Sequence, residues 1–133
     1  LNAIYLLYIK YSFILMFIER LLYIEMRKYV FGPVPSRRLG KSLGVNNIPA
    51  KICSYSCVYC QLGRTIRYSI ERDEYYDPRE VADEIIKCVE SYGKRKIRVV
   101  TFVPDGEPTL DKNLGKIIKM IENKIDKKIA VIS

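Results

Sequence analysis

Three of the four cysteines in this 133-residue chain lie within eight residues, as Cys53, Cys57 and Cys60. Thiolates are soft ligands that select iron–sulfur clusters, zinc or Cu(I). Because a [4Fe-4S] cluster normally takes four cysteines, three closely spaced ones leave one iron without a protein ligand. An open coordination position is typical of catalytic rather than structural metal centres. The C-x3-C-x2-C spacing therefore indicates an iron–sulfur site that can bind a second molecule.

Zinc is the main alternative, but a zinc site needs a fourth ligand. The chain has no histidine, and its remaining cysteine, Cys88, lies inside a helical pattern well beyond Cys60. We interpret Cys88 as a small core residue. Four cysteines in 133 residues are too sparse for a disulfide framework. Cysteine use of this kind favours a reducing, cytoplasmic location.

The composition, 49% hydrophobic and 29% charged, is that of a globular chain of one domain at most. The formal net charge is +8, and its placement is uneven. From Met26 to Ile70 there is no acidic residue, and the basic ones are Arg27, Lys28, Arg37, Arg38, Lys41, Lys51, Arg64 and Arg67. Such a stretch favours an anionic partner, for example RNA, a nucleotide or a phosphorylated small molecule. A generally basic, solvated surface is the alternative.

Residues 1–25 differ from the rest of the chain in being rich in Ile, Leu, Tyr and Phe. The longest uncharged runs, Leu1–Ile9 and Tyr11–Ile18, are shorter than the ~18–20 apolar residues of a membrane span. The features of a secretory signal are not present either. We expect residues 1–25 to be a translated upstream extension and residues 26–133 to form the domain. An amphipathic helix lying on a membrane or a partner is the alternative.

Within residues 26–133, hydrophobic periodicity predicts alternating strands and helices. The expected elements are a strand at 42–46, a helix from Asp77 to Gly93, a strand at 97–103, a helix at 110–125 and a strand at 129–132. The order β-α-β-α-β predicts an α/β fold with a right-handed parallel sheet. Residues 61–76 show no helical period, and we expect them to be irregular.

The first helix has a clear start signal. Asp77 is a good N-cap, Pro78 suits the first helical position, and Glu80 completes a pattern like a capping box. Gly93 is the expected stop. The strand at 97–103 is a near-continuous β-branched run, which is typical of a strand covered on both faces in a parallel sheet.

A second candidate site segment, Pro104–Thr109, directly follows this buried strand. In open α/β sheets, ligands bind beyond the carboxyl ends of the strands. The cysteine loop follows the first strand, so we expect both segments at the same edge of the sheet. Gly106 allows the backbone to approach a neighbour closely, and Glu107 offers a carboxylate to an amine.

These motifs together resemble those of the radical S-adenosylmethionine (SAM) enzymes, in which C-x3-C-x2-C is followed one strand later by a Gly-Glu motif. The segments GPVPSRRLGKSLGVN, CSYSCVYCQLG and FVPDGEPTL are similar to an iron–sulfur oxidoreductase group of archaea and bacteria. That group includes relatives of the tRNA wyosine-base synthases. The resemblance covers residues 29–133.

The resemblance implies that Cys53, Cys57 and Cys60 hold three irons of a [4Fe-4S] cluster. The fourth iron would bind the amine and carboxylate of SAM. The implied reaction is reductive cleavage of SAM to a 5′-deoxyadenosyl radical, which abstracts a hydrogen atom from a substrate. The cofactors carry this chemistry, and the protein supplies orientation and shielding. An electron donor is also implied, and the sequence does not identify it.

The resemblance further implies that Tyr59 lies against the adenine of SAM and that Gly106 and Glu107 receive the amine. The family more often has Gly-Gly-Glu where this chain has Asp105-Gly106-Glu107. No residue is implied as a catalytic acid, base or nucleophile.

The family core is a six-unit partial β/α barrel, and the resemblance covers about half of it. We therefore expect a partial, truncated radical SAM barrel, with a complementary C-terminal half as a candidate partner. Because hydrogen abstraction needs a closed pocket that excludes water, we expect such a chain to be incomplete as an enzyme. The alternatives are a non-catalytic iron–sulfur or zinc-binding module with a basic RNA-binding face, and a non-functional gene remnant.

Overall fold

A computed structural model describes residues 2–93 and 96–133 of the chain. Its main feature is a four-stranded sheet with the strand order β1-β2-β5-β6. The strands are β1 (Val30–Ser36), β2 (Gly40–Val45), β5 (Val99–Phe102) and β6 (Lys128–Val131). β2, β5 and β6 are parallel, whereas β1 pairs antiparallel with β2 at the edge. The sheet is therefore mixed but mostly parallel.

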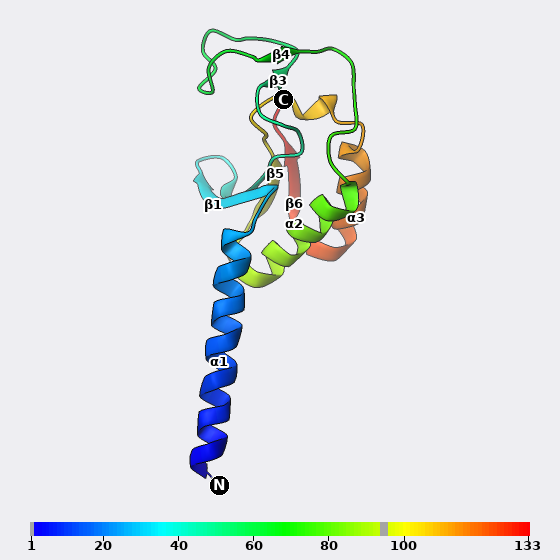
Figure 1. Cartoon of the computed structure of the whole chain (residues 1–133). Coiled ribbons are helices and arrows are strands. Elements are labelled where there is room, and N and C mark those ends of the chain that lie inside the picture. The colour runs from blue at the N-terminus through cyan, green and yellow to red at the C-terminus, as the bar shows by residue number, and fades with distance from the viewer. Residues whose placement is uncertain (1, 94–95) are drawn as a thin grey trace.

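The helices α2 (Pro78–Tyr92) and α3 (Leu114–Ile125) connect the parallel strands and pack together on one face of the sheet (Figure 1). The predicted β-α-β-α-β order is confirmed as β2-α2-β5-α3-β6. Alternate strand residues, Leu43, Val45, Val100 and Phe102, belong to one buried cluster with the apolar sides of both helices. All four residues of β5 are buried, as the β-branched run predicts.

The start of α2 follows from its local sequence. Asp77 is the N-cap, and its carboxylate accepts a hydrogen bond from the backbone N–H of Arg79 at 2.8 Å. The helix ends at Gly93, whose φ of 77° is favourable for glycine. Both signals are confirmed. Glu80 has a further contact that the sequence does not predict, because its carboxylate accepts a hydrogen bond from the Tyr29 hydroxyl at 2.9 Å.

The second helix begins later than the predicted residue 110. Pro108–Leu110 forms a short 3-10 turn, η1, and α3 starts only at Leu114. The reason is local: the Asp111 carboxylate accepts a hydrogen bond from the Asn113 N–H at 2.8 Å. Such a side-chain contact offers the backbone an alternative to the helical hydrogen bond. The backbone of residues 110–112 also pairs with Asp73, which fixes it outside the helix.

Two short strands, β3 (Ile52–Cys53) and β4 (Arg67–Tyr68), form a second, parallel pair. β4 lies in the stretch that we expected to be wholly irregular, so that expectation is wrong at these two residues. The pair holds the two ends of the segment that contains the cysteines. In Figure 1 this segment lies at the top, beyond the upper ends of β5 and β6.

Residues Asn2–Glu25 form one helix, α1, which extends away from the α/β part of the chain (Figure 1). The six consecutive apolar residues of Phe13–Ile18 are exposed. At about 100° per residue they point in every direction around the helix, so the pattern is not the single apolar stripe of an amphipathic helix. Among the described residues, no helix has both the length and the apolar character that crossing a membrane requires.

Glu84 on α2 holds the chain at the start of β1. One oxygen of its carboxylate accepts the backbone N–H groups of Lys28, Tyr29 and Val30, at 2.9, 2.8 and 3.0 Å. Tyr29 and Val30 are buried, so their N–H groups have little access to water if this acceptor is removed. Hydrogen bonds to a charged group are stronger than neutral ones.

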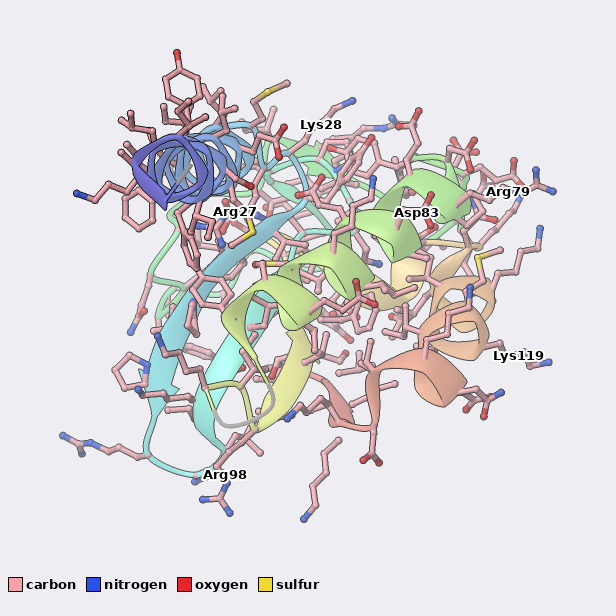
Figure 2. The ribbon with its side chains drawn as sticks, turned by 90° about the horizontal axis from the view of Figure 1, so that it is seen from below. Arg27, Lys28, Arg79, Asp83, Arg98 and Lys119 are labelled. Carbon is pink, nitrogen blue, oxygen red and sulfur yellow. The ribbon has the colours of Figure 1, made fainter. Side chains whose placement is uncertain are left out.

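We expect Glu84→Ala to lower the free energy of unfolding by about 2–3 kcal/mol, because it leaves buried donors without an acceptor. Urea unfolding followed by circular dichroism measures this. Asp83→Ala, at the exposed neighbouring position labelled in Figure 2, is the matched control and should change stability by less than about 0.5 kcal/mol. Equal effects of the two substitutions would contradict the role given to Glu84.

Candidate metal centre

The cysteine segment, residues 51–68, comes after β2 in the chain and is tied to the loop after β5. The backbone N–H of Lys51 donates to the Asp105 carbonyl at 2.6 Å, and that of Glu107 donates to the Ile52 carbonyl at 3.0 Å. These bonds lie directly before Cys53. The two segments at the carboxyl edge of the sheet are therefore joined, as their positions after parallel strands predict.

Gly106 is required at this junction by close contact. A Cβ at position 106 would lie 2.3 Å from the Ile52 carbonyl oxygen and 3.0 Å from the Ile48 side chain. Any side chain would therefore push the loop away from the start of the cysteine segment. The predicted close backbone approach at Gly106 is confirmed, and the neighbour it approaches is the strand that carries Cys53.

The three cysteines are placed by a strand end and by two backbone hydrogen bonds within the loop. Cys53 ends β3, the N–H of Cys60 donates to the Cys57 carbonyl at 3.0 Å, and the N–H of Gly63 donates to the Cys60 carbonyl at 3.2 Å. Cys53 and Cys57 are half-buried and Cys60 is exposed. All three are free thiols. The backbone N–H of Tyr55 also donates to the sulfur of Cys53 at 3.5 Å.

All three cysteines line one small cavity, with a volume of about 80 Å³. Lys51, Asp105 and Gly106 also line it, so the cavity lies between the cysteine segment and the loop after β5. The structure therefore brings together the residues that the sequence predicts as metal ligands, and it brings Gly106 to the same place. The roles of these residues stay a prediction.

The donor set fits a cubane cluster better than a single metal ion. In the described part of the chain, no three cysteine or carboxylate side chains are close enough to hold one ion. In a cubane each thiolate binds a different iron, so the three sulfurs surround a cluster and need not converge on one point. Three thiolates without a histidine or a nearby fourth cysteine are also the soft donors that iron–sulfur clusters take.

Glu107 is not among the residues that line this cavity, and its carboxylate makes structural contacts of its own. Its carboxylate accepts hydrogen bonds from the Thr109 N–H at 3.2 Å, the Thr109 hydroxyl at 2.6 Å and the Ser133 hydroxyl at 2.9 Å. It thus caps η1 and contacts Ser133, the second residue after β6. Glu107 as a whole is half-buried, but these hydrogen bonds of its carboxylate are exposed.

The sequence also matches a known protein family. The family match covers residues 47–133 and is to the radical SAM superfamily. The chain belongs to the radical SAM superfamily. The match includes all three cysteines and the Gly-Glu motif. No solved structure matches the chain.

Several curated proteins are similar to this radical SAM chain. A UPF0026 protein of Methanocaldococcus jannaschii is 54% identical over 103 residues, which are 77% of this chain and 32% of that protein. A protein of Brachyspira hyodysenteriae named GTPase Obg is 42% identical over 80% of this chain and 15% of its own length. A UPF0026 protein of Synechocystis is 37% identical over 78% of this chain and 38% of its own length. The chain thus spans well under half the length of these relatives.

Tyr59, which the radical SAM resemblance places against adenine, is 84% exposed. A hydrogen bond between its hydroxyl and the Cys57 thiol, together with the charge of Cys57, raises the pKa of Tyr59. Tyr59 belongs to the cysteine segment but is not among the residues that line the cavity. The assignment of Tyr59 to the adenine therefore stays a prediction.

The sequence reasoning missed a buried polar group behind the Gly-Glu loop. The amide of Asn47 is fully buried and donates to the Pro108 carbonyl and to the Asp111 carboxylate, both at 3.1 Å. Asn113 is also buried and contacts Asp111 through its backbone N–H. These bonds fix the turn after Glu107. The available signal is an Asn shortly after β2 together with an Asp and an Asn just before α3.

Burial raises the pKa of Asp111, against the lowering effect of the hydrogen bonds from Asn113 and Asn47. A carboxyl group with a raised pKa in the folded state favours folding less once it ionises. The contribution of Asp111 to the stability of the fold therefore falls as the pH rises above about 3.8, the ordinary pKa of an aspartate. Asn does not titrate, so we expect the free energy of unfolding of Asp111→Asn to increase relative to that of the wild type as the pH rises above 3.8. Urea unfolding at several pH values checks this, and a difference that is constant with pH would contradict it.

The basic stretch does not form one face beside the cysteines. Lys41 lies at the start of β2, and its carbonyl accepts a hydrogen bond from the N–H of Arg98, before β5. Arg98 lies beside the turn between β1 and β2 (Figure 2). The cysteine segment follows the opposite end of β2. Of the basic residues between 26 and 70, those in the cysteine segment are Lys51, Arg64 and Arg67.

Proposed function

We propose that this chain holds a [4Fe-4S] cluster on Cys53, Cys57 and Cys60 and binds SAM beside it, as part of a radical SAM enzyme. The observation that carries the proposal is that all three thiols and Gly106 of the Gly-Glu motif line the same cavity. When bound, a cluster with an iron free of protein ligands supplies an electron and a binding position for the cleavage of SAM.

The contributions of the chain itself are binding and orientation. The backbone bonds between Lys51 and Asp105 and between Ile52 and Glu107 set the distance between the cysteines and the Gly-Glu loop. Glu107 is one of the groups proposed to receive the SAM amine. Thr109 and Ser133, which now donate to its carboxylate, would orient it for that contact.

We further propose that the complete reaction takes place in a larger assembly of strands. β6 is the last strand of the described sheet, and Val131 on it is exposed. An unpaired strand edge is available for pairing with another strand. Additional β/α units paired with β6, in the same or a second chain, would extend the sheet towards a barrel and close the site against water.

The charge near the cavity supports an anionic substrate, and RNA stays our prediction for it. Arg64 and Arg67 are exposed on the cysteine segment itself. The basic residues at the far end of β2 are too distant along the strand to act at the same point. We also propose that the protein is cytoplasmic and that an external donor supplies the electron.

We expect Glu107→Ala to keep the cluster but to weaken SAM binding by tenfold or more, because a charged hydrogen bond worth about 1.5–3 kcal/mol is lost. Isothermal titration of SAM into the anaerobically reconstituted protein measures this. Glu71→Ala is the control, since Glu71 is exposed, lies outside the cavity lining and makes its hydrogen bonds to Ser69 through its backbone. Unchanged SAM affinity in Glu107→Ala would remove Glu107 from the site.

A further inference from the structure

Lys51 is an unusual lining residue of the cysteine cavity. Its Nζ atom is buried and has no hydrogen-bond partner in the part of the chain that the structure describes. A Cβ on Gly63 would lie 3.7 Å from this nitrogen, which places it beside the turn that follows Cys60. The side chain is therefore turned towards the cysteines and away from solvent.

The backbone of Lys51 is fixed from three sides. Its N–H donates to Asp105, and its carbonyl accepts the N–H groups of Ile66 and Arg67 at 3.0 and 3.1 Å. Its φ of 66° lies in the left-handed region, which costs a residue with a side chain about 1 kcal/mol or more. Glycine would suit that backbone better. The lysine side chain is thus present at a position where the local backbone does not favour it.

Burial of an ammonium group without a partner is costly. An anion that comes into contact with Nζ when the cavity is filled would recover this cost. A cubane held by three thiolates carries a net negative charge, and reduction by one electron increases that charge. The net charge and the contacts of a cluster are among the determinants of its reduction potential.

We propose that the ammonium group of Lys51 is a counter-ion of the iron–sulfur cluster and makes its reduction more favourable. This inference rests on the proposed function, because it needs the cluster to be bound by Cys53, Cys57 and Cys60. A positive charge beside the cluster stabilises the reduced form more than the oxidised form, because the reduced form is the more negative one. Lys51 would act through the cluster and take no part in bonds to SAM.

The test is the midpoint potential of the full chain, reconstituted with iron and sulfide and titrated with dithionite in the absence of SAM, with EPR detection. We expect Lys51→Met to make reduction at least tenfold less favourable, a potential lower by about 59 mV for one electron. Lys51→Arg should stay close to the wild type. Arg64→Met removes a charge from an exposed position in the same segment and should change the potential much less.

A second uncharged variant shows whether an effect of Lys51→Met comes from the lost charge or from misfolding. Lys51→Gly removes the charge and suits the left-handed backbone, so it should take up a cluster with the same lowered potential. Equal potentials in the wild type and both uncharged variants would overturn the proposal. Loss of the cluster from the Met, Gly and Arg variants alike would show a packing role and would also overturn it.

Two further outcomes separate this inference from the proposed function. Weaker SAM binding in Lys51→Met without a change of the SAM-free potential would assign Lys51 to the carboxylate of SAM and reject the counter-ion role. A wild-type chain that takes no cluster would reject the proposed function together with this inference.

Discussion

Cys57→Ala is expected to abolish the stable cubane, whereas Cys88→Ala is expected to retain it. Cys57 lines the cavity shared with the other two cysteines of the motif, and its loss leaves two protein thiolates for the cluster. Cys88 lies on the buried side of α2, in the hydrophobic core, with 1% of its surface exposed. Burial raises the pKa of its thiol. A buried thiol of this kind is a packing residue and a poor metal ligand.

Iron and sulfide content per chain, with the visible absorption of the anaerobically reconstituted protein, measures this difference. Far-UV circular dichroism of each variant confirms that the fold is kept. The pair is well matched, because each substitution removes one sulfur from the same chain. Cluster retention in Cys57→Ala, or its loss in a folded Cys88→Ala variant, would falsify the assignment of the ligands.

Gly106→Ala is expected to lower the free energy of unfolding by about 1–3 kcal/mol, the usual cost of overpacking. The added Cβ would lie 2.3 Å from the Ile52 carbonyl oxygen, which forces the loop away and breaks the bond from the Glu107 N–H. Because that bond positions the Gly-Glu motif against the cysteine segment, we also expect SAM affinity to fall by tenfold or more.

Gly115→Ala is the matched control for this substitution. Gly115 lies on an exposed position of α3, and a Cβ there would meet no atom within 4 Å. Alanine is favoured over glycine in a helix, so this variant should gain about 0.5–1 kcal/mol. Chemical unfolding compares the two directly. A Gly106→Ala variant as stable as the wild type would contradict the close contact on which the site geometry depends.

The sequence predicts the parallel part of the fold well because its signals are local. The N-cap Asp77, the stop at Gly93 and the β-branched run through Val99 and Val100 each fix an element by its own chemistry. The late start of α3 is missed because Asp111 makes two kinds of contact at once. It bonds to Asn113 nearby and to Asn47, 64 residues away in sequence, and the second contact has no local signal.

In the candidate site, too, some features are recognisable in the sequence and others are not. The cysteine spacing and Gly106 are recognisable from residue type and spacing alone, and the structure places these residues around one cavity. The buried position of the Lys51 nitrogen depends on three backbone bonds to segments that are distant in sequence. In the sequence this lysine is only one basic residue among eight between Met26 and Ile70. The division of that basic stretch between the two ends of β2 likewise appears only once the sheet is formed.

The most direct test of the account is low-temperature EPR of the full chain, reconstituted anaerobically with iron and sulfide and reduced with dithionite, with and without SAM. We predict the signal of a reduced [4Fe-4S] cluster that changes on addition of SAM, because one iron has no protein ligand and can take the cofactor. A cluster signal that is the same with and without SAM, or no cluster signal at all, would contradict the proposal that this chain forms a SAM-binding iron–sulfur site.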